Sequence, residues 1–99
     1  MNEPFNQLTA AQAERLAMLA EEAGEIVQCV TKILRHGYES VDPTLPEHKQ
    51  ITNRRHLNQE LGELFGIAYR MKLESDLPPE RGDDATIIWE KKLNWTHHQ

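Results

Sequence analysis

Hydrophobic residues recur every three or four positions along the first third of the chain, which is the period of an amphipathic helix. The pattern begins after Thr9, a good N-cap residue, and continues to Arg35, and Gly37 follows as a typical helix-stopping residue. We therefore predict a helix from Ala10 to Arg35. Its apolar stripe consists of Leu16, Leu19, Ala20, Ala23, Ile26, Val27, Val30, Ile33 and Leu34.

A second stretch with the same period follows a loop. The segment 37–50 contains two prolines and has no helical period, so we expect it to connect two helices. Thr52 or Asn53 can cap the second helix, which we expect to run to about Glu74. Its apolar face consists of Leu57, Leu61, Leu64, Ile67, Ala68 and Met71.

A third, shorter helix is predicted from about Asp84 to Trp95, after the turn-rich segment 75–84. It presents Ile87, Ile88 and Leu93, and we expect Trp89 and Trp95 to pack in the core or in a subunit interface. No segment shows the alternation of a strand, so the sequence predicts an all-α protomer of three helices, with residues 1–99 as one domain.

The length of the chain limits the core that it can build. A chain of 99 residues buries only roughly 60–65 % of its unfolded surface. The two long apolar stripes need more partner surface than one protomer offers, so we predict a helical bundle formed by dimerisation. The net charge of -5 argues against a nucleic-acid partner, because phosphate backbones require clustered Lys and Arg.

The chain has a single cysteine, Cys29, so it cannot form an intramolecular disulfide. No apolar run approaches the roughly 20 residues that cross a bilayer, and residues 1–8 lack the basic and apolar regions of a signal peptide. From these features we expect a cytoplasmic protein with no membrane partner.

Carboxylates occur beside the apolar faces of both long helices. Glu21, Glu22 and Glu25 lie on the first helix, and Glu22 sits at the edge of the stripe. On the second helix Glu60 falls inside the apolar arc and Glu63 falls at its border. A lone buried carboxylate is costly, and a cluster of them cannot ionise together unless a cation compensates the charge. If the two E-x-x-E pairs converge, oxygen ligands without His or Cys favour Mg²⁺ or Mn²⁺.

The same carboxylates allow two simpler interpretations. Most charged pairs at helical spacing form a solvated face, which would account for the glutamates of the first helix but not for Glu60. Alternatively, Glu60 is a structural ion-pair partner of Arg54 or Lys32.

The two acidic motifs, "EEAGE" and "ELGE", resemble the EExxE…ExxD signature of the MazG-like, all-α nucleoside triphosphate pyrophosphohydrolases. The similarity extends from about Leu16 to Met71 and includes the flanking segments "KILRHGYES" and "NRRHLNQELGEL". These flanks look most like those of small, stand-alone bacterial or phage members of the family.

The resemblance implies an Mg²⁺-dependent enzyme that cleaves the α–β phosphoanhydride of NTPs or dNTPs to the monophosphate and pyrophosphate. It implies a helical bundle built by dimers, sometimes tetramers. It also assigns roles to particular side chains: metal ligation to Glu22, Glu25, Glu60 and Glu63, proton transfer to Glu21 or Glu22, and phosphate contact to Lys32.

The chain departs from the family pattern at two points. Glu63 stands where the family usually has Asp, and the 34 residues between Glu25 and Glu60 make a long gap. The alternative function is therefore a catalytically weak or inactive helical module that binds a nucleotide or a protein and serves regulation. A third possibility is a purely structural helical bundle.

Overall fold

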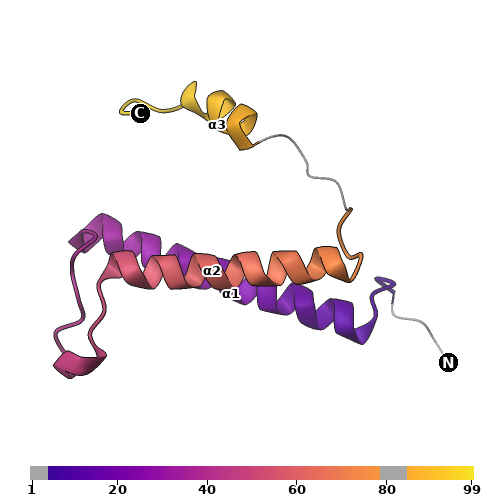
Figure 1. Ribbon diagram of the computed structural model, residues 1–99, viewed down its shortest axis with the longest axis horizontal. Helices are drawn as coiled ribbons and strands as arrows, with labels where there is room; N and C mark the ends of the chain where they lie inside the picture. The colour runs from indigo at the N-terminus through magenta and orange to yellow at the C-terminus, as the bar shows by residue number, and fades with distance from the viewer. Residues whose placement is uncertain (1–4, 79–84) are drawn as a thin grey trace.

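The computed structural model describes residues 5–78 and 85–99, the side chains of 85–88 excepted. Its elements are the helices α1 (Ala10–His36), α2 (Asn53–Leu73) and α3 (Ala85–Leu93), and a 3₁₀ turn, η1 (Glu47–Lys49), between the first two (Figure 1). These ranges contain no strand. The all-α class and the two long helices are confirmed, and the predicted start of the third helix at Asp84 lies outside the described residues.

Local side-chain chemistry fixes both ends of α1. The Thr9 hydroxyl accepts a hydrogen bond from the Gln12 backbone N–H at 3.1 Å, and the Gln12 side chain accepts one from the Thr9 N–H at 2.9 Å. This capping box satisfies two N–H groups that have no partner within the helix. At the other end Gly37 adopts φ +88° and donates its N–H to the Ile33 carbonyl. The predicted limits of the helix agree with these to within one residue.

The loop between α1 and α2 folds back on the first turn of α2. The Tyr38 carbonyl accepts a hydrogen bond from the Arg54 N–H at 2.9 Å, and the Thr52 hydroxyl caps the same turn through the Arg55 N–H. Arg54 also stacks on the Tyr38 ring and pairs with Glu39 at 2.7 Å. The loop thereby satisfies N–H groups that any helix leaves free at its start.

A Schellman motif ends α2. The Asp76 N–H donates to the Met71 carbonyl at 2.8 Å and the Ser75 N–H to the Lys72 carbonyl at 3.1 Å. Ser75 takes the left-handed conformation, with φ +62°, at the position where glycine is usual. The motif presents the Asp76 carboxylate to the Arg15 guanidinium, which donates to it at 2.9 Å from Nη2, and so the end of α2 is tied to the start of α1.

Helices α1 and α2 lie side by side along their length and form a two-helix hairpin (Figure 1). The residues buried between them, within the part described, are Cys29 and Met71, each 2 % exposed, and Glu60. On α1, Cys29 is buried and the stripe residues Leu19, Ile26 and Ile33 are partly buried, so only part of the apolar stripe faces α2.

Much of that stripe remains in contact with solvent. Its large exposed side chains, which we call the apolar flank of α1, are Leu16, Val27, Val30 and Leu34. On α2, Phe65 and Tyr69 are exposed as well. Helix α3 packs against neither long helix within the described ranges. Trp89 and Trp95 are exposed in the protomer, so they are not in its core, and their place in a subunit interface stays a prediction. None of the described helices is long and apolar enough to cross a membrane.

Candidate metal centre

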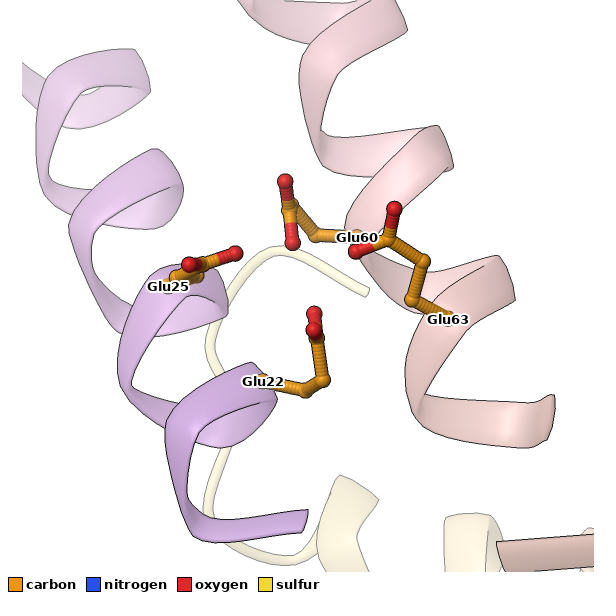
Figure 2. Close-up of side chains that lie close together, drawn as sticks. All are labelled: Glu22, Glu25, Glu60 and Glu63. Carbon is orange, nitrogen blue, oxygen red and sulfur yellow. The ribbon is translucent and has the colours of Figure 1, made fainter. Parts of the chain in front are cut away.

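Four carboxylates converge between α1 and α2. Glu22 and Glu25 come from α1, and Glu60 and Glu63 come from α2 (Figure 2). One oxygen of each lies within 4.8 Å of the corresponding oxygens of the other three. Side chains three residues apart on a helix point to the same edge, so each E-x-x-E pair presents both carboxylates to the facing helix. The structure thus brings the two acidic motifs together, as the sequence allowed.

The four carboxylates differ in how far they are exposed to solvent, and Glu60 is the least exposed of them. Glu60 is only 8 % exposed, and Glu22 and Glu25 are half-buried, whereas Glu63 is exposed. Oε2 of Glu22 and Oε2 of Glu60 are buried, and no donor in the described part of the chain reaches either oxygen. Buried oxygens of this kind are costly unless a proton or a cation reaches them.

The crowding changes the pKa values of the carboxyl groups. Contact with Glu60, then burial and the neighbouring Glu63, raises the pKa of Glu22 to about 7. Contact with Glu60 also raises the pKa of Glu25. The pKa of Glu60 itself is lowered, because its side-chain contacts with Glu25 and then Glu22 favour its charged form. The metal-free cluster therefore retains a proton on Glu22 up to a pH of about 7, and a divalent cation can take its place.

Two further side chains adjoin the cluster on the side nearer the loop. His56 lies one turn before Glu60 on α2, with its Nε2 atom 3.2 Å from Oε1 of Glu60. The Cys29 thiol is buried, and its burial, followed by the charge of Glu60, raises its pKa. The sequence motifs do not include His56. The signal that could have found it is its spacing of four residues from Glu60, which places both on one edge of the helix.

Two predicted site residues lie outside the four-carboxylate cluster. Glu21 is exposed, and its charge contributes to the raised pKa of Glu25. Lys32 lines a separate cavity of about 490 Å³ together with Arg35 and His36.

The described residues do not show Glu60 as the structural ion-pair partner of Arg54 or Lys32. Arg54 is paired with Glu39 instead, and Lys32 forms no ion pair with Glu60. The contact that Glu60 makes with a basic side chain is the one from His56.

No family model, curated protein or solved structure matches the chain. The similarity of "EEAGE" and "ELGE" to the MazG-like signature therefore stays a prediction from the motifs. The geometry of the cluster itself shows a set of oxygen ligands that could hold a metal ion.

Proposed function

We propose that the protein is an Mg²⁺-dependent nucleoside triphosphate pyrophosphohydrolase that acts on NTPs or dNTPs in the cytoplasm. The observation that carries the proposal is the convergence of four carboxylates around Glu60, which is buried and has no Lys or Arg partner among the described residues. The order and spacing of the motifs, which resemble the MazG-like signature, supply the reaction and the class of substrate.

The donor set suits a hard divalent cation. All four groups offer carboxylate oxygens, the ligands that Mg²⁺ prefers, and Mn²⁺ can use the same set. The unpartnered Oε2 atoms of Glu22 and Glu60 are the best-placed ligand atoms, because no donor in the described ranges satisfies them. Glu63 is exposed to solvent, so the phosphate oxygens of a substrate can approach the cluster from the side of Glu63.

The reaction adds a water oxygen to one phosphorus atom of the α–β bridge and breaks the bridging P–O bond. The products are the nucleoside monophosphate and pyrophosphate. A cation held by the four glutamates would neutralise charge on the phosphate oxygens and lower the pKa of water. The proton of the water passes to a carboxylate, and Glu22 suits this role better than the exposed Glu21 because it lies within the cluster.

The cavity beside Lys32 is where we propose that the phosphate chain extends. Lys32 follows Glu25 by seven residues on α1, which is about 10 Å along the helix axis. Lys32 and Arg35 both line this cavity, and no carboxylate is paired with either of them in the described structure. A phosphate group remote from the cluster can therefore contact Lys32.

We further propose that the protomers assemble as a homodimer or homotetramer. The apolar flank of α1 and the exposed Phe65 and Tyr69 of α2 offer surface that a second hairpin can bury. Pairing two hairpins would produce the helical bundle that the sequence predicts.

The direct test is turnover. We expect a panel of NTPs and dNTPs, incubated with Mg²⁺ and resolved by chromatography, to yield monophosphate and pyrophosphate. Glu60→Gln should abolish the reaction and the stabilisation by metal. Above the pKa of about 7 of Glu22, where the metal-free carboxylates are ionised together, it should leave the melting temperature equal or higher, because it relieves repulsion in the cluster. The matched control is Glu14→Gln, which makes the same substitution at an exposed glutamate of α1 outside the cluster. Release of monophosphate that survives Glu60→Gln would refute the assignment.

One feature of the site favours a second candidate function, a nucleotide-binding module without turnover. Glu63 is longer by one methylene than the Asp usual in the MazG-like motif, which moves the carboxylate by roughly 1 Å, as much as a catalytic geometry tolerates. A melting temperature that rises with nucleotide and Mg²⁺ in the absence of any product would identify this module.

A further inference from the structure

His56 stands next to the most buried carboxylate of the cluster. Its Nε2 atom lies 3.2 Å from Oε1 of Glu60, and the side chains are 38 % and 10 % exposed respectively. The imidazole therefore borders solvent, while the carboxylate that it contacts is enclosed between the helices. The four oxygens that lie within 4.8 Å of one another belong to the glutamates alone, so His56 adjoins the set without being part of it.

The contact distinguishes the two oxygens of Glu60. Oε1 faces His56, whereas Oε2 is buried and has no partner within the described residues. The terminal torsion of a glutamate is broad, so packing alone does not fix the plane of this carboxylate. A proton on Nε2, present in the imidazolium and in one neutral tautomer, favours keeping Oε1 where it is. The other oxygen, Oε2, then stays on the buried side of the carboxylate.

We infer that His56 is a positioning residue of the metal site: it holds Oε1 of Glu60 so that Oε2 serves as the metal ligand. This inference deepens the proposed function and rests on it, since it concerns a ligand of the same centre. Groups that contact a metal-ligating side chain from outside fix its orientation, and losing one typically weakens metal binding 10- to 100-fold.

The contact can also have a purely structural role, which a separate test detects. In that case His56 and Glu60 only stabilise the helix, as a pair four residues apart. The same helix contains a natural control for this. Arg70 and Glu74 form an ion pair at the same spacing, 2.9 Å apart, but their side chains are 63 % and 38 % exposed and neither belongs to the cluster. Removing Arg70 tests the helix-stabilising effect without touching the site.

The experiment measures the dissociation constant of Mn²⁺ alone, by calorimetry, for the wild type, His56→Ala, His56→Gln and Arg70→Ala. We expect His56→Ala to weaken binding about 10- to 100-fold. His56→Gln, which retains a side-chain N–H donor, should restore affinity to within about threefold, and Arg70→Ala should bind as the wild type does. Helical content by circular dichroism establishes that each variant folds. If His56→Ala does not fold, the comparison of His56→Gln with His56→Leu, which has similar bulk and no donor, replaces it.

Three results would overturn the inference. Wild-type affinity in His56→Ala would show that Glu60 needs no support, and the metal site itself would stand. Weak binding in both His56 variants would make His56 a ligand rather than a positioning residue. Failure of the wild type to bind Mn²⁺ would refute the metal site and the positioning role together. This result differs from the first two, in which the wild type binds the ion.

Discussion

Glu60 and Glu22 show how strongly a few side chains determine the character of this protein. Glu60 occupies a position that a hydrophobic residue would normally fill, and Glu22 retains a proton to a pH of about 7 because of its contact with Glu60. The folded chain thus holds protons that its unfolded form would release at a lower pH. This difference links the stability of the protein to pH.

We expect the metal-free protein to become less stable as the pH rises from about 5 to about 8. A carboxyl group whose folded pKa lies above its unfolded value stabilises the fold when protonated, and that contribution is lost as the pH rises through the folded pKa, about 7 for Glu22. Because Mg²⁺ replaces the protons, its stabilising effect should grow over the same range. Thermal melts with and without Mg²⁺ check both trends.

Glu22→Gln serves as the control for the pH trend, since it removes the titrating group and leaves the histidines in place. Any dependence of stability on pH that persists in this variant comes from other groups. A wild type and a Glu22→Gln variant with the same dependence on pH would show that the cluster does not retain protons.

Individual residues of the centre were predictable from the sequence to different degrees. Glu60 was identifiable, because a helical period places it inside an apolar arc, where a solvated face does not account for a charge. His56 was not, because a histidine four residues before a glutamate is common on exposed helix surfaces, and only the burial of Glu60 makes the pair unusual. The distance of Lys32 from the cluster follows from its spacing on α1, but the cavity that it lines depends on how the loop folds, which no local pattern indicates.

At the scale of elements, both long helices are followed by a residue with a positive φ, and the two residues differ in type. Ser75 ends α2 with φ +62° and Gly37 ends α1 with φ +88°. Only the second has the residue that this conformation favours, because a Cβ atom crowds the following carbonyl in the left-handed region. The added Cβ would meet no other atom at Gly37, so the cost of a substitution there comes from the backbone.

We expect Ser75→Gly to raise the free energy of unfolding by about 0.5–1 kcal/mol, the relief of the left-handed strain less the added flexibility of glycine. Gly37→Ala should lower it by about 1 kcal/mol or more. Urea denaturation followed by circular dichroism measures both. A Ser75→Gly variant that is less stable than the wild type would mean that the serine side chain contributes to the Schellman motif.

The limits of the long helices were predictable because they depend on local chemistry. Thr9, Gly37 and Thr52 act within one turn of their own positions, and the structure uses each as a cap. The turn η1 was missed, since it lies in a segment of mixed composition that follows two prolines. The tie between Arg15 and Asp76 was also missed, because it joins residues that only the folded hairpin brings together.

For the whole molecule, the decisive property is the small amount of apolar surface that one protomer buries. Within the described ranges Val27 is 61 % exposed and Leu34 is 80 % exposed, although both belong to the stripe that the sequence marks as apolar. A hairpin with so thin a core gains little from packing alone. A second copy would cover surface that is costly to leave in water.

We therefore expect light scattering in solution to give twice or four times the protomer mass of 11.5 kDa. Val27→Glu, which introduces a charge into the apolar flank, should shift the protein toward the protomer. Gln28→Glu introduces the same charge at the next position, off that flank, and should leave the assembly intact. A mass of one protomer for the wild type at micromolar concentrations would contradict the proposed bundle.

The lone thiol of Cys29 connects packing with chemistry. It is 2 % exposed, and burial and the nearby Glu60 raise its pKa, so in the closed hairpin it is both shielded and protonated. An electrophile or oxidant can reach it only after α1 and α2 separate locally. That separation also pulls apart the carboxylates that the two helices contribute. The lifetime of the reduced thiol and the occupancy of the cluster are thus governed by one opening equilibrium, and a cation that bridges the helices protects a sulfur atom it never touches.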